Sequence, residues 1–119
     1  MFTAYQKRNG DIQKKLQVKE LADAMAAAGI RCECWPEMGV LEVLLGEAGS
    51  IDLEVSEIVF EGEDLIFLEN HDIAMVYEIS FAEEAVTQAG TAFSALAAAT
   101  SGVVCSDTED FYPVYAGSF

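Results

Sequence analysis

The distribution of charge constrains this chain more than any other feature of its sequence. Residues 32–119 contain 18 acidic residues and neither a lysine nor an arginine, and the whole chain carries a formal net charge of −15. Because these carboxylates have no lysine or arginine within that segment to pair with, they repel one another and must lie on solvated surface. Apolar residues make up 52% of the 119-residue chain, which is enough for one hydrophobic core. We therefore expect a single folded domain, 1–119, with an acidic surface.

Three explanations of the acidity are open: solubility, adaptation to high salt, and binding of a cationic partner. The acidic residues are unevenly placed, because 22 consecutive residues, 85–106, carry no charge at all. A general surface adaptation would have charged that segment too, so the pattern favours a binding surface. Nucleic acid is excluded as a partner, because binding its phosphates requires lysines and arginines.

Two segments have the spacing and end signals of amphipathic helices. The first is expected from Asp11, which can cap the helix, to the residue before Gly29, which suits a left-handed closing position. The second is expected to open directly after Ser80, because Ser80 and Glu83 have the spacing of a capping box. It should end at 101–102, where a serine and a glycine follow the last apolar turn.

Short apolar segments, separated by turn residues, predict strands. The clearest period-two alternation is 51–55, and it resumes irregularly at 58 and 60. Residues 61–64 are expected to form a hairpin turn. The other predicted strands are 30–34, 40–45, 65–69, 73–79 and 103–105. The fold class is therefore α+β, an antiparallel β-meander of about five strands with two helices packed on one face. The other face, which an antiparallel sheet can leave wet, would carry Glu33, Glu42, Asp52 and Glu54.

The C-terminal tail, 106–119, is acidic and then aromatic. It contains Asp107, Glu109 and Asp110, followed by the aromatic residues Phe111, Tyr112, Tyr115 and Phe119. Such aromatic residues either fold back over the sheet edge or core, which is the preferred interpretation, or form a contact patch for a partner.

No residue pattern in the chain is specific for catalysis, a cofactor or a metal. His71 is the single histidine and lies in a predicted turn. Cys32, Cys34 and Cys105 are an odd number of cysteines in a chain without an export signal, which argues against a disulfide framework, and a metal site that combines them with His71 lacks the usual zinc spacing. We therefore predict that the chain is not an enzyme and has no cofactor or metal.

Localisation follows from two segments. The uncharged stretch 85–106 is long enough to span a membrane, but alanine dominates it and it contains several threonines and serines, so it is expected to be a helix of a soluble domain. Residues 1–10 lack the apolar run of a secretory signal. A cytoplasmic protein without a membrane partner is expected.

The expected partner is a basic protein domain. The predicted partner-binding residues are Glu33, Glu42, Asp52, Glu54, Glu61, Glu63, Asp64, Asp107, Glu109, Asp110 and Tyr112. The run 96–107, LAAATSGVVCSD, resembles the end of small immunity proteins of bacterial polymorphic toxins, in which a helix closes at a glycine and leads into a short strand and an acidic turn. The resemblance covers a dozen residues, implies toxin neutralisation in the cytoplasm without catalysis, and assigns no binding residue.

Three other functions remain open beside that of an immunity protein. A cytosolic secretion chaperone fits the size and the pI of about 4.1, although the C-terminal helix expected of such chaperones is missing. A nucleic-acid mimic that blocks a DNA-binding protein is another alternative, and an enzyme of unfamiliar type is the last. The oligomeric state does not follow from the sequence.

Overall fold

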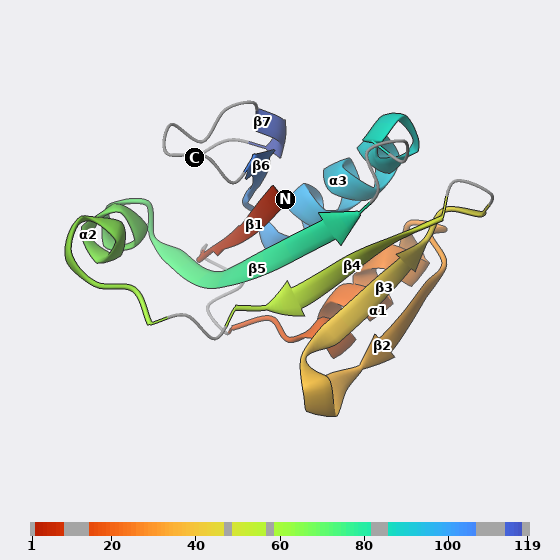
Figure 1. Cartoon of the computed structure of the whole chain (residues 1–119), viewed down its shortest axis with the longest axis horizontal. Helices are drawn as coiled ribbons and strands as arrows, with labels where there is room; N and C mark the ends of the chain where they lie inside the picture. Colours follow the sequence, from red (N-terminus) through yellow and green to blue (C-terminus); the bar gives the residue numbers. More distant parts are fainter. Residues whose placement is uncertain are drawn as a thin grey trace.

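The computed structural model describes residues 2–8, 15–46, 49–56, 59–81, 86–106 and 114–117. These residues form one seven-stranded antiparallel sheet and three α-helices (Figure 1). In chain order the elements are β1 Phe2–Lys7, α1 Val18–Ala27, β2 Cys32–Trp35, a short 3-10 helix Pro36–Met38, β3 Val40–Leu44, β4 Ser50–Val55, α2 Gly62–Asn70, β5 Ile73–Phe81, α3 Val86–Thr100, β6 Val103–Ser106 and β7 Val114–Gly117. The predicted α+β class with an antiparallel sheet is confirmed.

The strand order is β2-β3-β4-β5-β1-β6-β7, with every neighbouring pair antiparallel. Strands β2 to β5 form the predicted meander. The sheet then departs from a meander, because β1 lies between β5 and β6. Among the described strands, β2 and β7 are therefore the two edges of the sheet.

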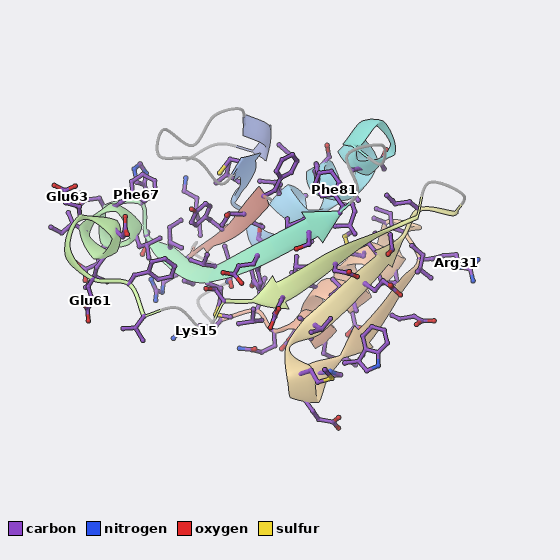
Figure 2. All side chains as sticks on the ribbon, viewed as in Figure 1. Lys15, Arg31, Glu61, Glu63, Phe67 and Phe81 are labelled. Carbon is purple, nitrogen blue, oxygen red and sulfur yellow. The ribbon has the colours of Figure 1, made fainter. Side chains whose placement is uncertain are left out.

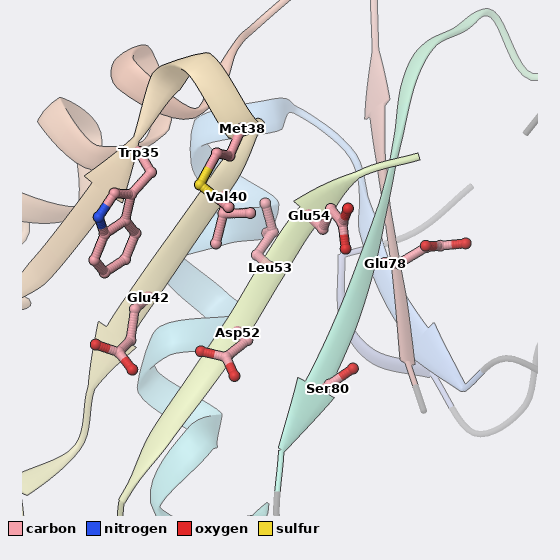
Figure 3. Close-up of a pocket in the computed structure, with 9 residues that line it drawn as sticks. All are labelled: Trp35, Met38, Val40, Glu42, Asp52, Leu53, Glu54, Glu78 and Ser80. Atoms are coloured by element: carbon pink, nitrogen blue, oxygen red, sulfur yellow. The ribbon is translucent and has the colours of Figure 1, made fainter. Parts of the chain in front are cut away.

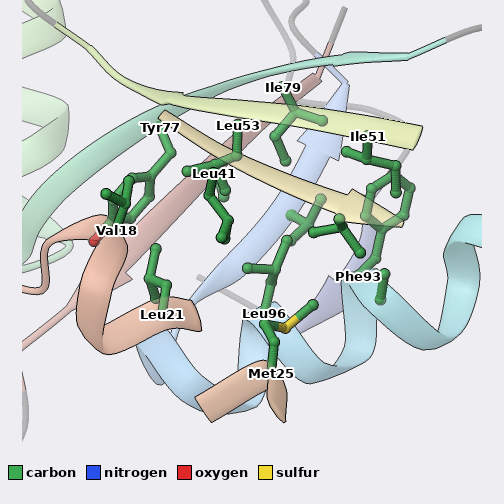
Figure 4. Close-up of a cluster of buried hydrophobic side chains, with 14 of the residues drawn as sticks. Val18, Leu21, Met25, Leu41, Ile51, Leu53, Tyr77, Ile79, Phe93 and Leu96 are labelled. Atoms are coloured by element: carbon green, nitrogen blue, oxygen red, sulfur yellow. The ribbon is translucent and has the colours of Figure 1, made fainter. Parts of the chain in front are cut away.

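Helices α1 and α3 pack on one face of the sheet, called here the inner face (Figure 4). In α1 the buried side chains follow one stripe, Val18, Leu21 and Met25. In α3 the buried stripe includes Phe93 and Leu96, which meet inward-facing side chains of the strands. The prediction of two helices on one face is confirmed, and the core lies between these helices and the inner face.

Strand β1 was not predicted, and it lies near the centre of the sheet. Residues 3–6 are all buried, including the polar Gln6, so the segment has no clean alternation for sequence analysis to find. The Gln6 side chain is satisfied inside the core, because its Oε1 accepts a hydrogen bond from the Leu16 amide (2.8 Å). The Tyr77 hydroxyl donates to the Leu16 carbonyl (2.6 Å), and burial raises the pKa of Tyr77.

The same two contacts explain why α1 is shorter than predicted. Because Gln6 and Tyr77 bind both backbone groups of Leu16, residues 15–17 are held outside the helix. The helix begins at Val18, where the Gln17 amide donates to the Glu20 carboxylate (3.1 Å). It ends as predicted before Gly29, whose φ is +81°. The predicted cap, Asp11, lies outside the described residues.

The predicted strand 65–69 and the hairpin turn 61–64 are wrong, because Gly62–Asn70 is the helix α2. A short apolar run suits a strand or a helix equally by periodicity. Here Phe67 and Leu68 are partly buried while Leu65 and Ile66 are exposed, which is a helical rather than an alternating pattern. The predicted resumption of the preceding strand is also wrong: β4 ends at Val55, and 59–61 is not a strand.

The start of the second predicted helix is wrong, and its end is correct. Ser80 and Phe81 belong to β5, where they pair with Asp52 and Ile51, so Ser80 does not cap a helix. Helix α3 closes at 101–102, and a Cβ on Gly102 would lie only 1.7 Å from the Tyr5 carbonyl oxygen. The fold therefore requires glycine at the point where the chain turns into β6.

The tail contributes a strand to the sheet. Residues Val114–Gly117 form β7 and pair with β6, although no strand was predicted there. This pairing places the described part of the tail along the edge of the sheet, next to β6. The positions Phe111, Tyr112 and Phe119 lie outside the described residues.

Candidate partner-binding surface

Five carboxylates project from the face of the sheet opposite α1 and α3, called here the outer face. Inward Leu41, Val43, Ile51 and Leu53 are fully buried, so the residues that alternate with them point outward. Strand register places Glu33 opposite Glu42, Glu42 opposite Asp52, and Glu54 opposite Glu78. We name this set the acidic patch: Glu33, Glu42, Asp52, Glu54 and Glu78.

Glu42 and Asp52 are the most closely opposed pair of the patch. The Leu45 amide donates to the Gly49 carbonyl (2.9 Å), which makes 45 and 49 a hydrogen-bonded pair between β3 and β4. Because such pairs alternate, Glu42 and Asp52 form a non-hydrogen-bonded pair, the type in which side chains approach more closely. Figure 3 shows their carboxylates side by side. Ser50 Oγ donates to Glu42 Oε2 (3.3 Å) and so compensates part of this negative charge.

A groove of about 580 Å³ lies over the patch (Figure 3). Its acidic lining consists of Glu42, Asp52, Glu54 and Glu78, and its apolar rim includes Trp35 and Met38. Trp35 is 41% exposed and Met38 is 69% exposed, although both are large apolar side chains. Among the residues that the structure describes, no lysine or arginine lines this groove. An aromatic ring beside several carboxylates suits a cationic group that carries an apolar stem.

Three of the described basic residues, Arg8, Lys19 and Arg31, lie outside the groove. Lys19 pairs with Asp23 along α1 (2.8 Å), and this contact raises the pKa of Lys19. Arg8 lies 3.5 Å from Asp72 and also donates to the Ile73 carbonyl (3.2 Å). Figure 2 places Arg31 beyond the far end of the outer strands. The negative potential over the groove is therefore not locally neutralised by these residues.

The structure brings together only part of the predicted site. Glu33, Glu42, Asp52 and Glu54 share the outer face, as expected. In contrast, Glu61, Glu63 and Asp64 lie around the start of α2, at the opposite end of the molecule from Arg31 (Figure 2). There the acids face the positive end of the helix dipole, which gives them a local stabilising role. The predicted positions Asp107, Glu109, Asp110 and Tyr112 lie outside the described residues.

Sequence analysis missed three residues of the groove. Glu78 lies between the inward-facing Tyr77 and Ile79, so the alternation of β5 already placed it on the outer face. Trp35 follows Glu33 by two residues and shares its face, but it lies one residue beyond the predicted strand 30–34. Met38 belongs to the 3-10 turn, and no periodicity could have placed it.

The cysteines and the histidine do not converge. Cys32 and Cys34 lie on the inner side of β2. The pKa of the Cys32 thiol is raised, mainly by burial and also by the nearby Cys34. Cys105 is buried in β6, towards the other edge of the sheet, in a small cluster with Tyr5. His71 follows α2, with its ring centroid 4.4 Å from that of Phe67. Within the described part of the chain, no group of three or more histidine, cysteine or acidic side chains is arranged to hold a metal.

The comparisons with known proteins do not assign the chain to a family. No family model matches the chain, and neither a curated protein nor a solved structure is similar to it by sequence or fold. Among the helices described, none combines the length and the apolar character that crossing a membrane requires. We therefore infer the function from the geometry of the outer face.

Proposed function

We propose that this chain is an acidic binding protein that neutralises a basic protein partner, and that the acidic patch and its groove form the docking surface. The observation that carries the proposal is the concentration of five carboxylates on one exposed sheet face, in cross-strand register, four of which line a groove that Trp35 and Met38 border. Solubility alone requires neither this clustering nor exposed apolar side chains beside it.

The clustering also has an energetic consequence that favours binding. Like charges directly opposite each other on neighbouring strands destabilise a sheet. The patch contains three such contacts, Glu33 with Glu42, Glu42 with Asp52, and Glu54 with Glu78. A cationic partner would relieve all three at once, so the repulsion in the free protein becomes part of the driving force for association.

Within this proposal the chain acts as an immunity protein that inhibits a cognate bacterial toxin in the cytoplasm. Toxins that attack nucleic acid need basic surfaces, and an acidic inhibitor captures them rapidly by electrostatic steering. The resemblance of 96–107 to the end of immunity proteins supports the same class. No catalytic step is proposed, because inhibition requires only that the partner's basic surface be covered.

The docking surface is tested by charge reversal with a matched control. The test variant changes Glu42, Asp52 and Glu54 to lysine, and the control changes Glu61, Glu63 and Asp64 to lysine, so both alter the net charge equally. The probe is a fluorescent oligo-arginine peptide, and stopped-flow anisotropy at low salt gives its association rate. We expect at least about tenfold slower association for the test variant than for the control. Equal rates for the two variants, with both folded by circular dichroism, would refute the assignment of the surface.

The immunity role has a separate test in cells. The proteins encoded by the genes adjacent to this one are each expressed with and without the chain, and growth is measured to find a toxic product. We expect the chain to restore growth and the test variant to lose protection. Failure of the wild-type chain to protect, despite binding of oligo-arginine, would exclude the immunity role and leave only general cation binding.

A secretion chaperone is the alternative that a specific observation favours. Val59 is 81% exposed, Ile66 is 57% exposed and Leu65 is 42% exposed, so apolar side chains are solvent-accessible around α2. Such residues suit an unfolded apolar segment rather than a folded basic surface. Ile66→Asp distinguishes the two, because it should weaken binding of an unfolded effector segment and leave binding of oligo-arginine unchanged.

A further inference from the structure

We propose that the basic partner docks through an extended strand that pairs with β2 and alternates basic and apolar residues. This inference rests on the proposed function and specifies what the partner presents to the acidic patch. It starts from β2, which is the first strand in the order of the described sheet and has no strand on its other side (Figure 1).

The free edge of β2 exposes a defined set of backbone groups. The Leu44 amide donates to the Arg31 carbonyl (2.9 Å), which makes 31 and 44 a hydrogen-bonded pair between β2 and β3. Because hydrogen-bonded and non-hydrogen-bonded pairs alternate, the N–H and C=O groups of Cys32 and Cys34 point away from β3. The edge thus offers two donors and two acceptors, spaced as an added strand requires.

The two faces beside this edge differ in chemistry. Glu33 and Trp35 are exposed on the outer face, next to Glu42 of the acidic patch. Cys32 and Cys34 are half-buried on the inner face, where they pack against the core. A strand added to β2 would place its own alternate side chains on the same two faces. Basic side chains would then lie beside Glu33 and Trp35, and apolar side chains beside the two thiols.

A second copy of this chain fits the edge poorly. Pairing two β2 strands antiparallel would bring Glu33 of each copy onto the same outer face near the centre of the contact, and the basic residue beside it is Arg31, directly before β2. Each copy also carries a formal net charge of −15. Charge complementarity therefore selects a cationic strand over self-association.

The test uses synthetic peptides with the full wild-type chain. The first peptide alternates arginine and valine over seven residues, and the second has the same composition with the arginines and valines in separate blocks. Two further versions of the alternating peptide carry backbone N-methyl groups, either on the valines or on the arginines. In the proposed pairing the peptide runs antiparallel to β2, so its valine N–H groups face β2 and its arginine N–H groups face away. Affinity is measured by fluorescence anisotropy, and amide chemical shifts locate the contact.

We expect the alternating peptide and its arginine-methylated version to bind alike and to shift the amide signals of Cys32 and Cys34. Methylation of the valines should weaken binding about tenfold or more, because each removes a hydrogen bond to the edge. Equal binding of all four peptides would overturn strand addition while leaving the proposed function intact. Binding of none of them at low salt would overturn both, because the acidic patch would then not capture cations.

A protein variant tests the same edge from the other side. Cys34→Pro removes one outward-facing N–H without removing a hydrogen bond to β3, and Cys34→Ala removes the thiol but keeps that N–H. We expect Cys34→Pro, but not Cys34→Ala, to weaken binding of the alternating peptide several-fold. If both variants bind it as the wild-type chain does, the edge of β2 is not the docking element. A dimer of the free wild-type chain in sedimentation, broken by Cys34→Pro, would also contradict the proposal, because the edge would then serve self-association.

Discussion

Glu42→Gln should make the free protein more stable, although it removes a charge from the surface. Glu42 lies opposite Glu33 on one side and Asp52 on the other, so the neutral amide relieves two like-charge contacts. Glutamine has nearly the shape of glutamate and keeps an oxygen that can accept the hydrogen bond from Ser50. The substitution therefore tests charge with little change in packing.

The expected gain is about 1 kcal/mol in the free energy of unfolding at low salt. Each directly opposed cross-strand pair contributes about 0.2–1 kcal/mol, and two such repulsive pairs are relieved. Urea unfolding at neutral pH gives this free energy, measured at about 10 mM and about 1 M salt, where the Debye length falls from about 30 Å to about 3 Å. The difference between variant and wild type should shrink at high salt. Glu42→Gln should also weaken capture of oligo-arginine, so stability and binding change in opposite directions.

Glu63→Gln is the matched control, because it removes one charge from the exposed first turn of α2. There the carboxylate interacts favourably with the helix dipole, so neutralisation should lower stability by a few tenths of a kcal/mol. A double-mutant cycle of Glu42→Gln with Asp52→Asn should give a non-zero coupling energy for the closest pair. A Glu42→Gln variant that is no more stable than wild type at low salt would refute the repulsion argument.

Three further predictions concern the fold. Gly102→Ala should destabilise the protein by more than about 2 kcal/mol in urea unfolding, because the new Cβ would overlap the Tyr5 carbonyl oxygen. Gly90→Ala, which adds a Cβ in open space on α3, should instead stabilise the protein by about 0.5–1 kcal/mol. Similar effects of the two substitutions would mean that the turn before β6 is wrongly placed. Tyr77 has a raised pKa, so its phenol ionises in the unfolded chain at a lower pH than in the folded one, and stability should fall as pH rises above about 10. In Tyr77→Phe the decrease in the free energy of unfolding that Tyr77 causes above about pH 10 should disappear. At neutral pH the variant should be less stable by about 1 kcal/mol, because the hydrogen bond to the Leu16 carbonyl is lost. If stability falls with alkaline pH as steeply in the variant as in the wild type, Tyr77 is not buried as described. Leu96→Asp should abolish the folded circular dichroism spectrum, because Leu96 is fully buried in the hydrophobic core and a carboxylate there would lose its hydration. A folded variant would show that the position of α3 in the core is wrong.

Local sequence patterns correctly predicted the features that depend on neighbouring residues. The alternation of 51–55 placed Asp52 and Glu54 on the outer face, and the same rule placed Glu33 and Glu42 there. Gly29 and the serine and glycine at 101–102 also predicted where α1 and α3 end. These features follow from backbone periodicity and from positive φ, which a residue and its near neighbours decide.

Contacts between different segments of the chain decided the features that the local patterns predicted wrongly. Residues 65–68 lie in a helix from which Leu68 packs against the cluster of Tyr5, Ile73, Val103 and Cys105, and a short apolar run by itself cannot select between helix and strand. The first helix lost its opening turn to the hydrogen bonds of Leu16 with Gln6 and Tyr77, which are far from it in sequence.

The acidic patch depends both on local sequence patterns and on long-range contacts. The sequence by itself determined that the chain is strongly acidic, that its strands alternate, and which side of each strand carries a carboxylate. Only the tertiary structure decided that Glu78 joins Glu54, that Trp35 and Met38 border the groove, and that β1 fills the middle of the sheet. The physical reason is that side-chain direction is a local property of a strand, whereas strand order and register depend on burial and hydrogen bonding between segments distant in the chain.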